Sequence, residues 1–159
     1  MTPPNDDVAP RPVAETAGMT RLLVPIRGSQ DTDRVIARVV ELYRQTPVEV
    51  HLLNVQPPLP GHVAMFFSAD EIRAFHCDDA REELRAARQA LIDAGIPFTC
   101  HIEVGEYVAA VAAFASEHRC RHVVLHDDRV GALAQFILGS AASRVRQLID
   151  GSSALCELV

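Results

Sequence analysis

The chain has 159 residues, 48% of them hydrophobic, which suits a single compact domain with a core of ordinary size. Its formal net charge is −6, so no general electrostatic field favours nucleic acid or an anionic membrane surface as a partner. The sequence contains no lysine, and all 15 basic residues are arginine. This excludes a GxxxxGK[ST] phosphate loop, a Schiff-base enzyme and a phosphate-accepting receiver domain, because each depends on a lysine.

The first residues differ from the rest of the chain. Residues 1–19 are rich in proline and acidic residues and have no apolar period, so we expect a disordered arm before a domain over residues 20–159. They also lack the basic start and apolar stretch of a signal peptide, and no long apolar run follows. We therefore expect a cytoplasmic protein with no membrane partner.

Short apolar runs bounded by turn residues predict five strands. They cover residues 21–26, 48–55, 98–104, 121–125 and 154–159. Between them, helical spacing of apolar residues predicts four helices. These cover residues 31–45, 68 to about 94, about 107–117 and 140–149. Strands that alternate with helices imply a parallel sheet with right-handed crossovers and helices on both faces, which is an open α/β sandwich.

The start of the second predicted helix and the loop before it carry two distinctive patterns. Ser68 to Glu71 has the S-x-x-E form of a capping box and marks the helix start. Just before it, Met65, Phe66 and Phe67 form an unusually apolar loop segment. We expect this segment to be covered by a lid contact, by a partner or by the helix behind it, and packing within the chain is the favoured interpretation.

The most informative motif is Gly139-Ser140, which opens the last helix. A helix start presents free backbone N–H groups and the positive end of the helix dipole, and both suit an anion. A flexible glycine turn after the fourth strand would complete a phosphate site. His126 and Arg129 stand there instead.

The order and spacing of five segments resemble the universal stress protein family in its UspA-like, single-domain form. The segments are residues 22–29, 52–55, 104–105, 123–125 and 137–140. The resemblance implies a Rossmann-like sheet, similar to adenine nucleotide alpha hydrolases, with strand order 3-2-1-4-5. Ligands of such sheets bind in the crevice between the first and fourth strands.

Family members that bind ATP look like G-x2-G-x9-G-[ST] after the fourth strand. Counting back from Gly139, His126 and Arg129 occupy the positions of the two earlier glycines. Arg27 replaces an aspartate that usually ends the first strand in the family. By contrast, the family pattern is kept at Gly105, Gly139 and Ser140. The resemblance therefore implies a degenerate ATP-binding motif. We expect no resident cofactor, with ATP or AMP as the alternative.

Two interpretations of the altered crevice remain open. In the first, His126 and Arg129 fill the phosphate space and Arg27 pairs with Asp127 or Asp128, which closes the pocket. In the second, cationic side chains converge on the start of the last helix and bind a small anion or a differently posed nucleotide. The nearby aspartates favour the first. The second makes six residues candidate ligands: Arg27, Gly105, His126, Arg129, Gly139 and Ser140.

Metal and catalytic chemistry receive little support from the sequence. Neighbours such as Cys100 and His101 point to opposite faces of a strand, and no paired knuckle spacing exists, so we expect no metal site. We expect the four cysteines to be free core residues: Cys77, Cys100, Cys120 and Cys156. His126 and Asp127 could act as a general base, but no nucleophile is specified, so a hydrolase is only a remote alternative.

The last strand predicts self-association. It lies at a sheet edge with unpaired backbone groups, and in the family it pairs with its copy across a two-fold axis. The expected interface residues are Leu155, Cys156, Glu157, Leu158 and Val159. The sequence thus predicts a dimeric, non-catalytic stress-response protein that contacts other proteins and binds ATP weakly or not at all. The alternative is a sensor that binds an adenine nucleotide or another anion in the crevice.

Overall fold

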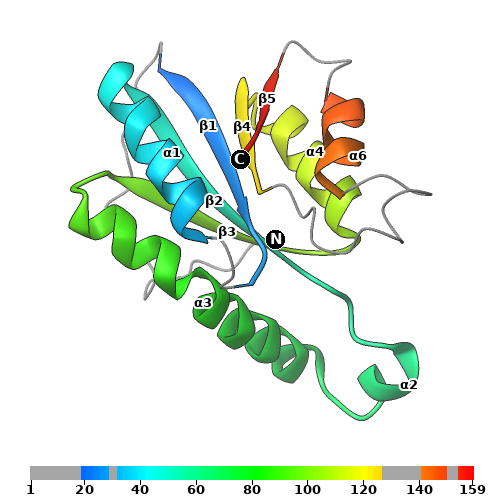
Figure 1. The fold of residues 1–159 in the computed structure, drawn as a ribbon. Coiled ribbons are helices and arrows are strands. Elements are labelled where there is room, and N and C mark those ends of the chain that lie inside the picture. The colour runs from blue at the N-terminus through cyan, green and yellow to red at the C-terminus, as the bar shows by residue number, and fades with distance from the viewer. Residues whose placement is uncertain (1–18, 29–31, 127–140, 150–153) are drawn as a thin grey trace, which may run out of the picture.

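The computed structural model describes residues 19–28, 32–126, 141–149 and 154–159. Five parallel strands form one sheet in the order β3-β2-β1-β4-β5 (Figure 1). They are β1 (Thr20–Ile26), β2 (Val48–Gln56), β3 (Phe98–Val104), β4 (His122–Leu125) and β5 (Leu155–Leu158). This order and the α/β class confirm the predicted fold. The predicted arm lies, except for its last residue, outside the described residues.

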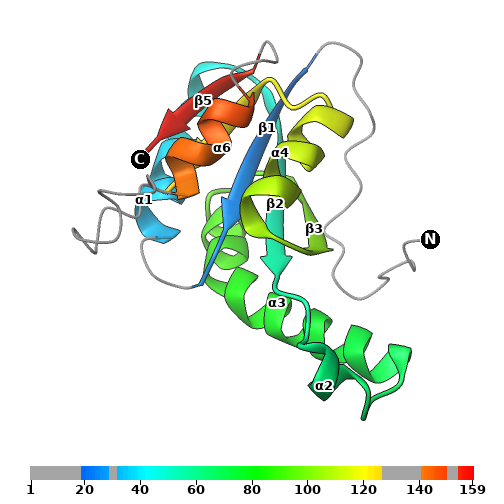
Figure 2. The same cartoon turned by 90° about the vertical axis from the view of Figure 1, so that its right-hand side faces the viewer.

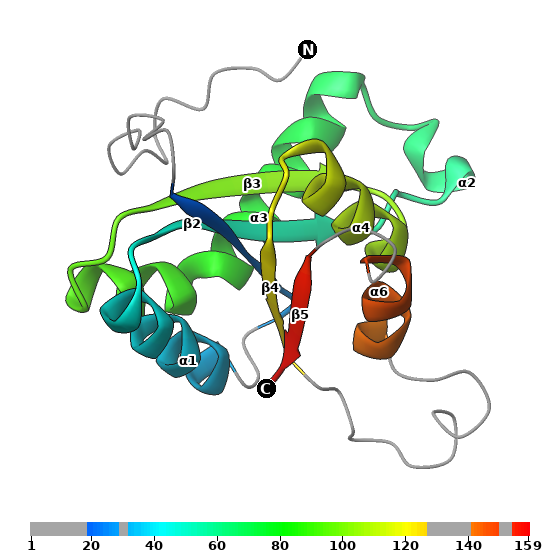
Figure 3. The same cartoon turned by 90° about the horizontal axis from the view of Figure 1, so that it is seen from above.

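Two layers of helices cover the sheet (Figure 3). One face packs on α1 (Thr32–Gln45) and α3 (Ala69–Asp93), whose buried residues join a core cluster with Leu22, Val24 and Leu52. The other face packs on α4 (Tyr107–Glu117) and α6 (Ala141–Ile149), around Leu23, Leu53 and Val123. Neighbouring residues of one strand therefore serve opposite cores, as expected for a parallel sheet buried on both faces.

The cysteines divide between burial and partial exposure. All four are free thiols; Cys120 and Cys156 are buried, as predicted, whereas Cys77 and Cys100 are only partly buried. Burial raises the pKa of the Cys100 and Cys120 thiols to about 11. Both are therefore neutral and poorly nucleophilic at physiological pH.

The start of α3 has the predicted capping box. Ser68 Oγ accepts a hydrogen bond from the Glu71 backbone N–H at 3.2 Å, and the Glu71 carboxylate accepts one from the Ser68 N–H at 2.7 Å. The first helical residue that is buried is His76, so the initial turns of α3 project beyond the core together with the short helix α2 (Gly61–Ala64) (Figures 1 and 2).

The prediction that the helix behind covers the apolar loop is wrong within the described residues. Met65 and Phe66 are 74% and 78% exposed, and Phe67 is half exposed. The reason is that α2 and the first turn of α3 lie beyond the sheet, where neither element contributes a buried residue for them to pack on. Contact with a partner or a lid remains an expectation.

Helix α4 ends in a Schellman motif with an unusual residue. The Cys120 N–H donates to the Ala115 carbonyl at 2.8 Å, and the Arg119 N–H donates to the Ser116 carbonyl at 3.2 Å. Arg119 has a φ of 53°, the left-handed conformation that glycine adopts without a steric penalty. An arginine at this position is therefore strained.

We expect Arg119→Gly to raise the free energy of unfolding by about 0.5–1 kcal/mol, because it removes this steric penalty. Urea denaturation at pH 7 measures the change. As a control, Arg73→Gly in the right-handed helical backbone of α3 is expected to lower stability by about 1 kcal/mol. A loss of stability in Arg119→Gly would contradict the assigned strain.

A half-buried ion pair ties the edge strand β5 to the domain. The Nε and Nη2 atoms of Arg38 donate to Glu157 at 2.6 and 3.3 Å, and His122 Nε2 lies 3.2 Å from Glu157 Oε2. Burial raises the pKa of Glu157, but the hydrogen bonds from Arg38 and His122 outweigh this, and the pKa lies below the ordinary value of 4.5. The ionised carboxylate therefore stabilises the fold.

We expect Glu157→Gln to lower the free energy of unfolding by about 1–2 kcal/mol at pH 7. The carboxylate's contribution is present above the ordinary pKa of 4.5 and is lost as the pH falls, so the difference should shrink in acid. The control is Glu41→Gln, because Glu41 binds the same Arg38 at 2.7 Å from a more exposed position. Equal losses in both variants at pH 7 would contradict the special role of Glu157.

Candidate functional site

The candidate crevice lies where the strand order reverses, at the carboxyl ends of β1 and β4. The two strands pair directly, with Leu22 opposite His122 and Leu23 opposite Val123. Arg27 follows β1 and His126 follows β4, so both predicted site residues lie at this edge of the sheet. Arg129, Gly139 and Ser140 lie outside the described residues.

Arg27 is exposed, and its guanidinium group lies over the ring of Tyr107, the first residue of α4. Its guanidinium carbon is 5.0 Å from the centre of the Tyr107 ring, within the range of a cation–π interaction. The predicted partners of Arg27, Asp127 and Asp128, lie outside the described residues. Tyr107 is a contact that the sequence analysis did not predict.

Glu106 adds a carboxylate beside Arg27. It is the N-cap of α4, where its side chain accepts a hydrogen bond from the Ala109 N–H at 2.8 Å. This hydrogen bond lowers the pKa of Glu106 most, and the charges of Arg144 on α6 and of Arg27 lower it further. The negative charge of Glu106 is therefore felt by Arg27, which follows β1, and by Arg144 of α6.

A second carboxylate reaches the end of β1 from α3. Glu83 Oε2 accepts hydrogen bonds from the Gly28 backbone N–H at 3.2 Å and from Asn54 Nδ2 at 2.7 Å. Asn54 Nδ2 also donates to the Ile26 carbonyl at 3.1 Å, and Asn54 Oδ1 accepts from Gln56 at 2.7 Å. Gly28 has a φ of 73° and so turns the chain sharply at this point. Its N–H is occupied by the protein itself.

Comparison with known proteins identifies the family. A family model described as "Universal stress protein family" matches residues 19–152. The chain belongs to this family. No curated protein matches the sequence.

Three solved universal stress proteins show the same fold at low sequence identity. UspA from Lactobacillus plantarum is 19% identical, with a TM-score of 0.64 over 91% of this chain and 98% of that chain. A universal stress protein from Archaeoglobus fulgidus in complex with dAMP is 20% identical, with a TM-score of 0.57 over 88% of this chain and 95% of that chain. A universal stress protein from Arabidopsis thaliana with AMP bound is 14% identical, with a TM-score of 0.55 over 88% of this chain and 89% of that chain.

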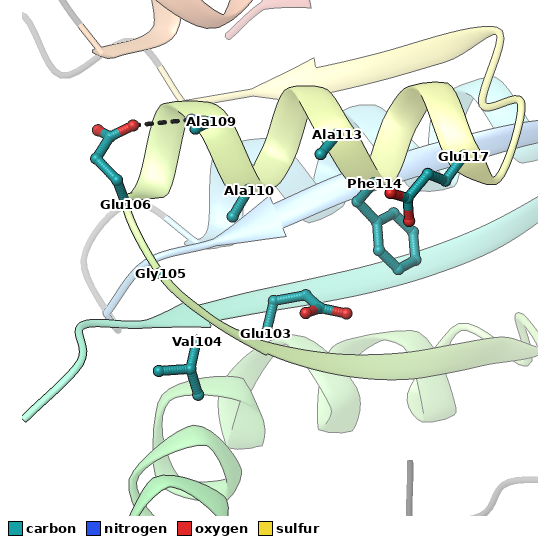
Figure 4. A pocket seen from close by; sticks show the side chains of 9 residues that line it. All are labelled: Glu103, Val104, Gly105, Glu106, Ala109, Ala110, Ala113, Phe114 and Glu117. Atoms are coloured by element: carbon teal, nitrogen blue, oxygen red, sulfur yellow. Dashed lines mark hydrogen bonds between the residues drawn. The ribbon is translucent and has the colours of Figure 1, made fainter. Parts of the chain in front are cut away.

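Gly105 lies in a different hollow of this universal stress protein. Its N–H donates to the Gln56 carbonyl at 3.0 Å, and it lines a hollow of about 340 Å³ between β3 and α4 (Figure 4). The lining carboxylates are Glu103, Glu106 and Glu117, and no basic residue accompanies them. Neither Arg27 nor His126 lines this hollow. Its charge disfavours a phosphate.

The structure brings only part of the predicted ligand set together. Arg27 lies near Glu106, the residue after Gly105, whereas His126 is partly buried at the end of β4. Asn54 and Glu83 are candidate-site residues that were not predicted from the sequence. A polar residue at the end of an apolar strand was a signal for Asn54, but nothing distinguished Glu83 from the other charged residues of its helix.

The described residues hold no group of three or more histidine, cysteine or acidic side chains arranged for a metal ion. Over the same part of the chain, no helix combines the length and apolar character needed to cross a membrane. His101 and Cys100 lie on opposite faces of β3, as predicted: His101 stacks near Phe114, and Cys100 packs with the core of the other face.

Proposed function

We propose that this universal stress protein acts without catalysis, through protein contacts in a cytoplasmic stress response, and binds ATP weakly or not at all. The observation that carries the proposal is that polar groups just after β1 already have contacts within the chain. Glu83 accepts the Gly28 N–H at 3.2 Å, and Arg27 lies on the Tyr107 ring at 5.0 Å.

This arrangement opposes a phosphate for two physical reasons. A phosphate binds best to backbone N–H groups that are free, and the Gly28 N–H already donates to a carboxylate. In addition, Glu83 and Glu106 place negative charge at the same strand end, near the cations that would attract the ligand. Within the described residues, the Gly28 N–H and Arg27 therefore already have contacts inside the chain.

Isothermal titration calorimetry tests this proposal. With ATP, AMP and inorganic phosphate injected separately at high protein concentration, we expect no saturable heat from any of the three. Submillimolar binding that is lost in Arg129→Ala would contradict the proposal. That result would also assign Arg129 to the ligand.

The second candidate function is a sensor that binds an adenine nucleotide or another anion. It is favoured by the relatives that bind dAMP and AMP and by the presence of Arg27 and Arg144 around one carboxylate. On this proposal a ligand anion competes with Glu106 for the two arginines. Weak anion binding that Arg27→Ala abolishes and Glu106→Gln strengthens would support the sensor.

Self-association is the other part of the proposal. Strand β5 pairs with β4 alone among the described residues, and its first residue, Leu155, is 63% exposed. The N–H groups of Leu155 and Val159 donate toward β4, to the Arg121 and Leu125 carbonyls. By alternation, the N–H group of Leu158 points away from β4, where a second copy of the strand can pair with it.

A further inference from the structure

A cluster of histidines lies between the sheet and the end of α4, away from the crevice. His51 on β2 is buried, and His101 on β3 and His118 after α4 are partly buried. His51 Nδ1 is 2.9 Å from His101 Nε2. The Phe114 ring stacks on His118, with ring centres 3.9 Å apart, and lies 4.7 Å from the His101 ring. The cluster thus joins α4 to two strands.

The distance between His51 and His101 restricts their protonation. At 2.9 Å one ring nitrogen must donate and the other must accept, so the contact requires at least one neutral ring. If His101 Nε2 donates, His51 Nε2 carries a hydrogen and faces Glu49 Oε1 at 3.2 Å, although without the alignment of a full hydrogen bond. His51 is then neutral. Two protonated rings would place two donors and two positive charges against each other.

The charged groups around His51 and His101 do not compensate for the positive charge of a second proton on this pair. Arg21 of β1 donates to Glu49 at 3.3 Å and to the His118 carbonyl at 2.9 Å, so the one carboxylate beside His51 already has a cationic partner. Cys120, which follows α4, is a neutral thiol because burial raises its pKa to about 11. Glu103 and Glu117 are exposed and lie on either side of Phe114 in the acidic hollow (Figure 4).

We propose that His51 and His101, with the stacked rings of Phe114 and His118, form a proton-operated latch, which holds the end of α4 on the sheet at neutral pH and releases it when His51 and His101 are both protonated. The latch acts on the same helix that reaches the crevice. Tyr107 at the start of α4 contacts Arg27. At the other end of the helix, Phe114 packs against the cluster, and the C-cap residue His118 belongs to it. Release of α4 therefore changes the contacts of Arg27, and mild acid becomes a signal that alters the surface of the protein.

The direction of the pH effect follows from burial. Burial, together with the neighbouring His51 and His118, lowers the pKa of His101 to about 4. Burial also lowers the pKa of His51. A histidine in the released state regains a pKa near 6.5, so released molecules bind more protons between about pH 6.5 and 4. The latch is therefore fully stable above pH 6.5 and weakens as the pH falls through this range.

Hydrogen exchange of the α4 amides, corrected for intrinsic rates, tests the latch. From pH 7 to pH 5, the pKa of about 4 for His101 predicts a rise of roughly 20-fold in the opening equilibrium of α4, whereas α3 should change much less. We expect His101→Phe to remove most of the rise, because phenylalanine cannot be protonated. The matched control is His76→Phe, which changes a buried histidine outside the cluster and should leave the rise intact.

An unchanged opening equilibrium of α4 between pH 7 and 5 in the wild type would overturn the proposal, as would an equal effect of both variants. NMR titration of the wild-type histidine rings keeps the test independent of the variants. We expect His101 to titrate near a pKa of about 4 and His51 below 6.5, and an ordinary pKa near 6.5 for either ring would also overturn the latch. The latch does not depend on the proposed function, since neither measurement uses a nucleotide or a dimer.

Discussion

Leu155→Glu is expected to convert the proposed dimer into monomers while the domain stays folded. Leu155 is 63% exposed at the start of the edge strand, so a polar side chain there costs the monomer little. In a two-fold contact through β5, each substitution appears twice, and two new carboxylates lose water and repel each other. We expect the dimer dissociation constant to rise by at least about 100-fold. Multi-angle light scattering at tens of micromolar protein measures it.

The matched control is Ile92→Glu on α3. Ile92 is a similarly exposed apolar residue, at 54%, but it lies away from β5 and should leave the association unchanged. A wild-type protein that is monomeric at tens of micromolar would contradict the dimer itself. A dimer that persists in Leu155→Glu but is lost in Ile92→Glu would move the interface to α3.

Asn54→Leu is expected to cause the largest loss of stability among polar substitutions at the candidate site, about 2–4 kcal/mol. Asn54 is completely buried and links Ile26, Glu83 and Gln56. Leucine has a similar volume but removes the donor to the Ile26 carbonyl and to Glu83. The Glu83 carboxylate then loses its shorter hydrogen bond and keeps the one from the Gly28 N–H at 3.2 Å, in a low-dielectric environment. Urea denaturation at pH 7 measures the loss.

The exposed amide of Gln89 provides the control, since it bonds only to Asp93 on the same helix, at 2.8 Å. Gln89→Leu should change stability by less than about 0.5 kcal/mol. If Asn54→Leu is equally mild, the network at the end of β1 does not hold the strand ends. In a second variant, Glu83→Gln in the Asn54→Leu background, we expect part of the stability to return, because the charge that has lost the Asn54 hydrogen bond is gone.

The sequence predicted the fold well because the hydrophobic pattern and the turn residues act locally. Apolar runs bounded by glycine and proline define β1 to β4 to within one residue at each end, and Ser68 with Glu71 marks the start of α3 through its capping box. The sheet order came from the resemblance to the family. The exposure of Phe66 was not predictable, because the pattern does not reveal that the first turns of α3 extend past the sheet.

The candidate site was less predictable, because its contacts join residues far apart in the sequence. Gly28 and Glu83 meet only after α3 packs on the sheet, and the rotation of the helix decides which of its acidic residues faces the strand end. The contact between His51 and His101 depends on the register of β2 and β3, in which Leu53 lies opposite His101. Sequence patterns indicate such residues as polar, but they do not indicate their partners.

We infer that charged groups of the chain itself take the place of a nucleotide in the crevice. Calorimetric titration of ATP into the wild type and into the triple variant Arg27→Asp/His126→Gly/Arg129→Gly tests it most directly, since that variant restores the family pattern at three positions. We expect no saturable binding by the wild type, and binding by the variant at least about tenfold tighter than any residual wild-type affinity. A submillimolar dissociation constant for ATP in the wild type would contradict the account.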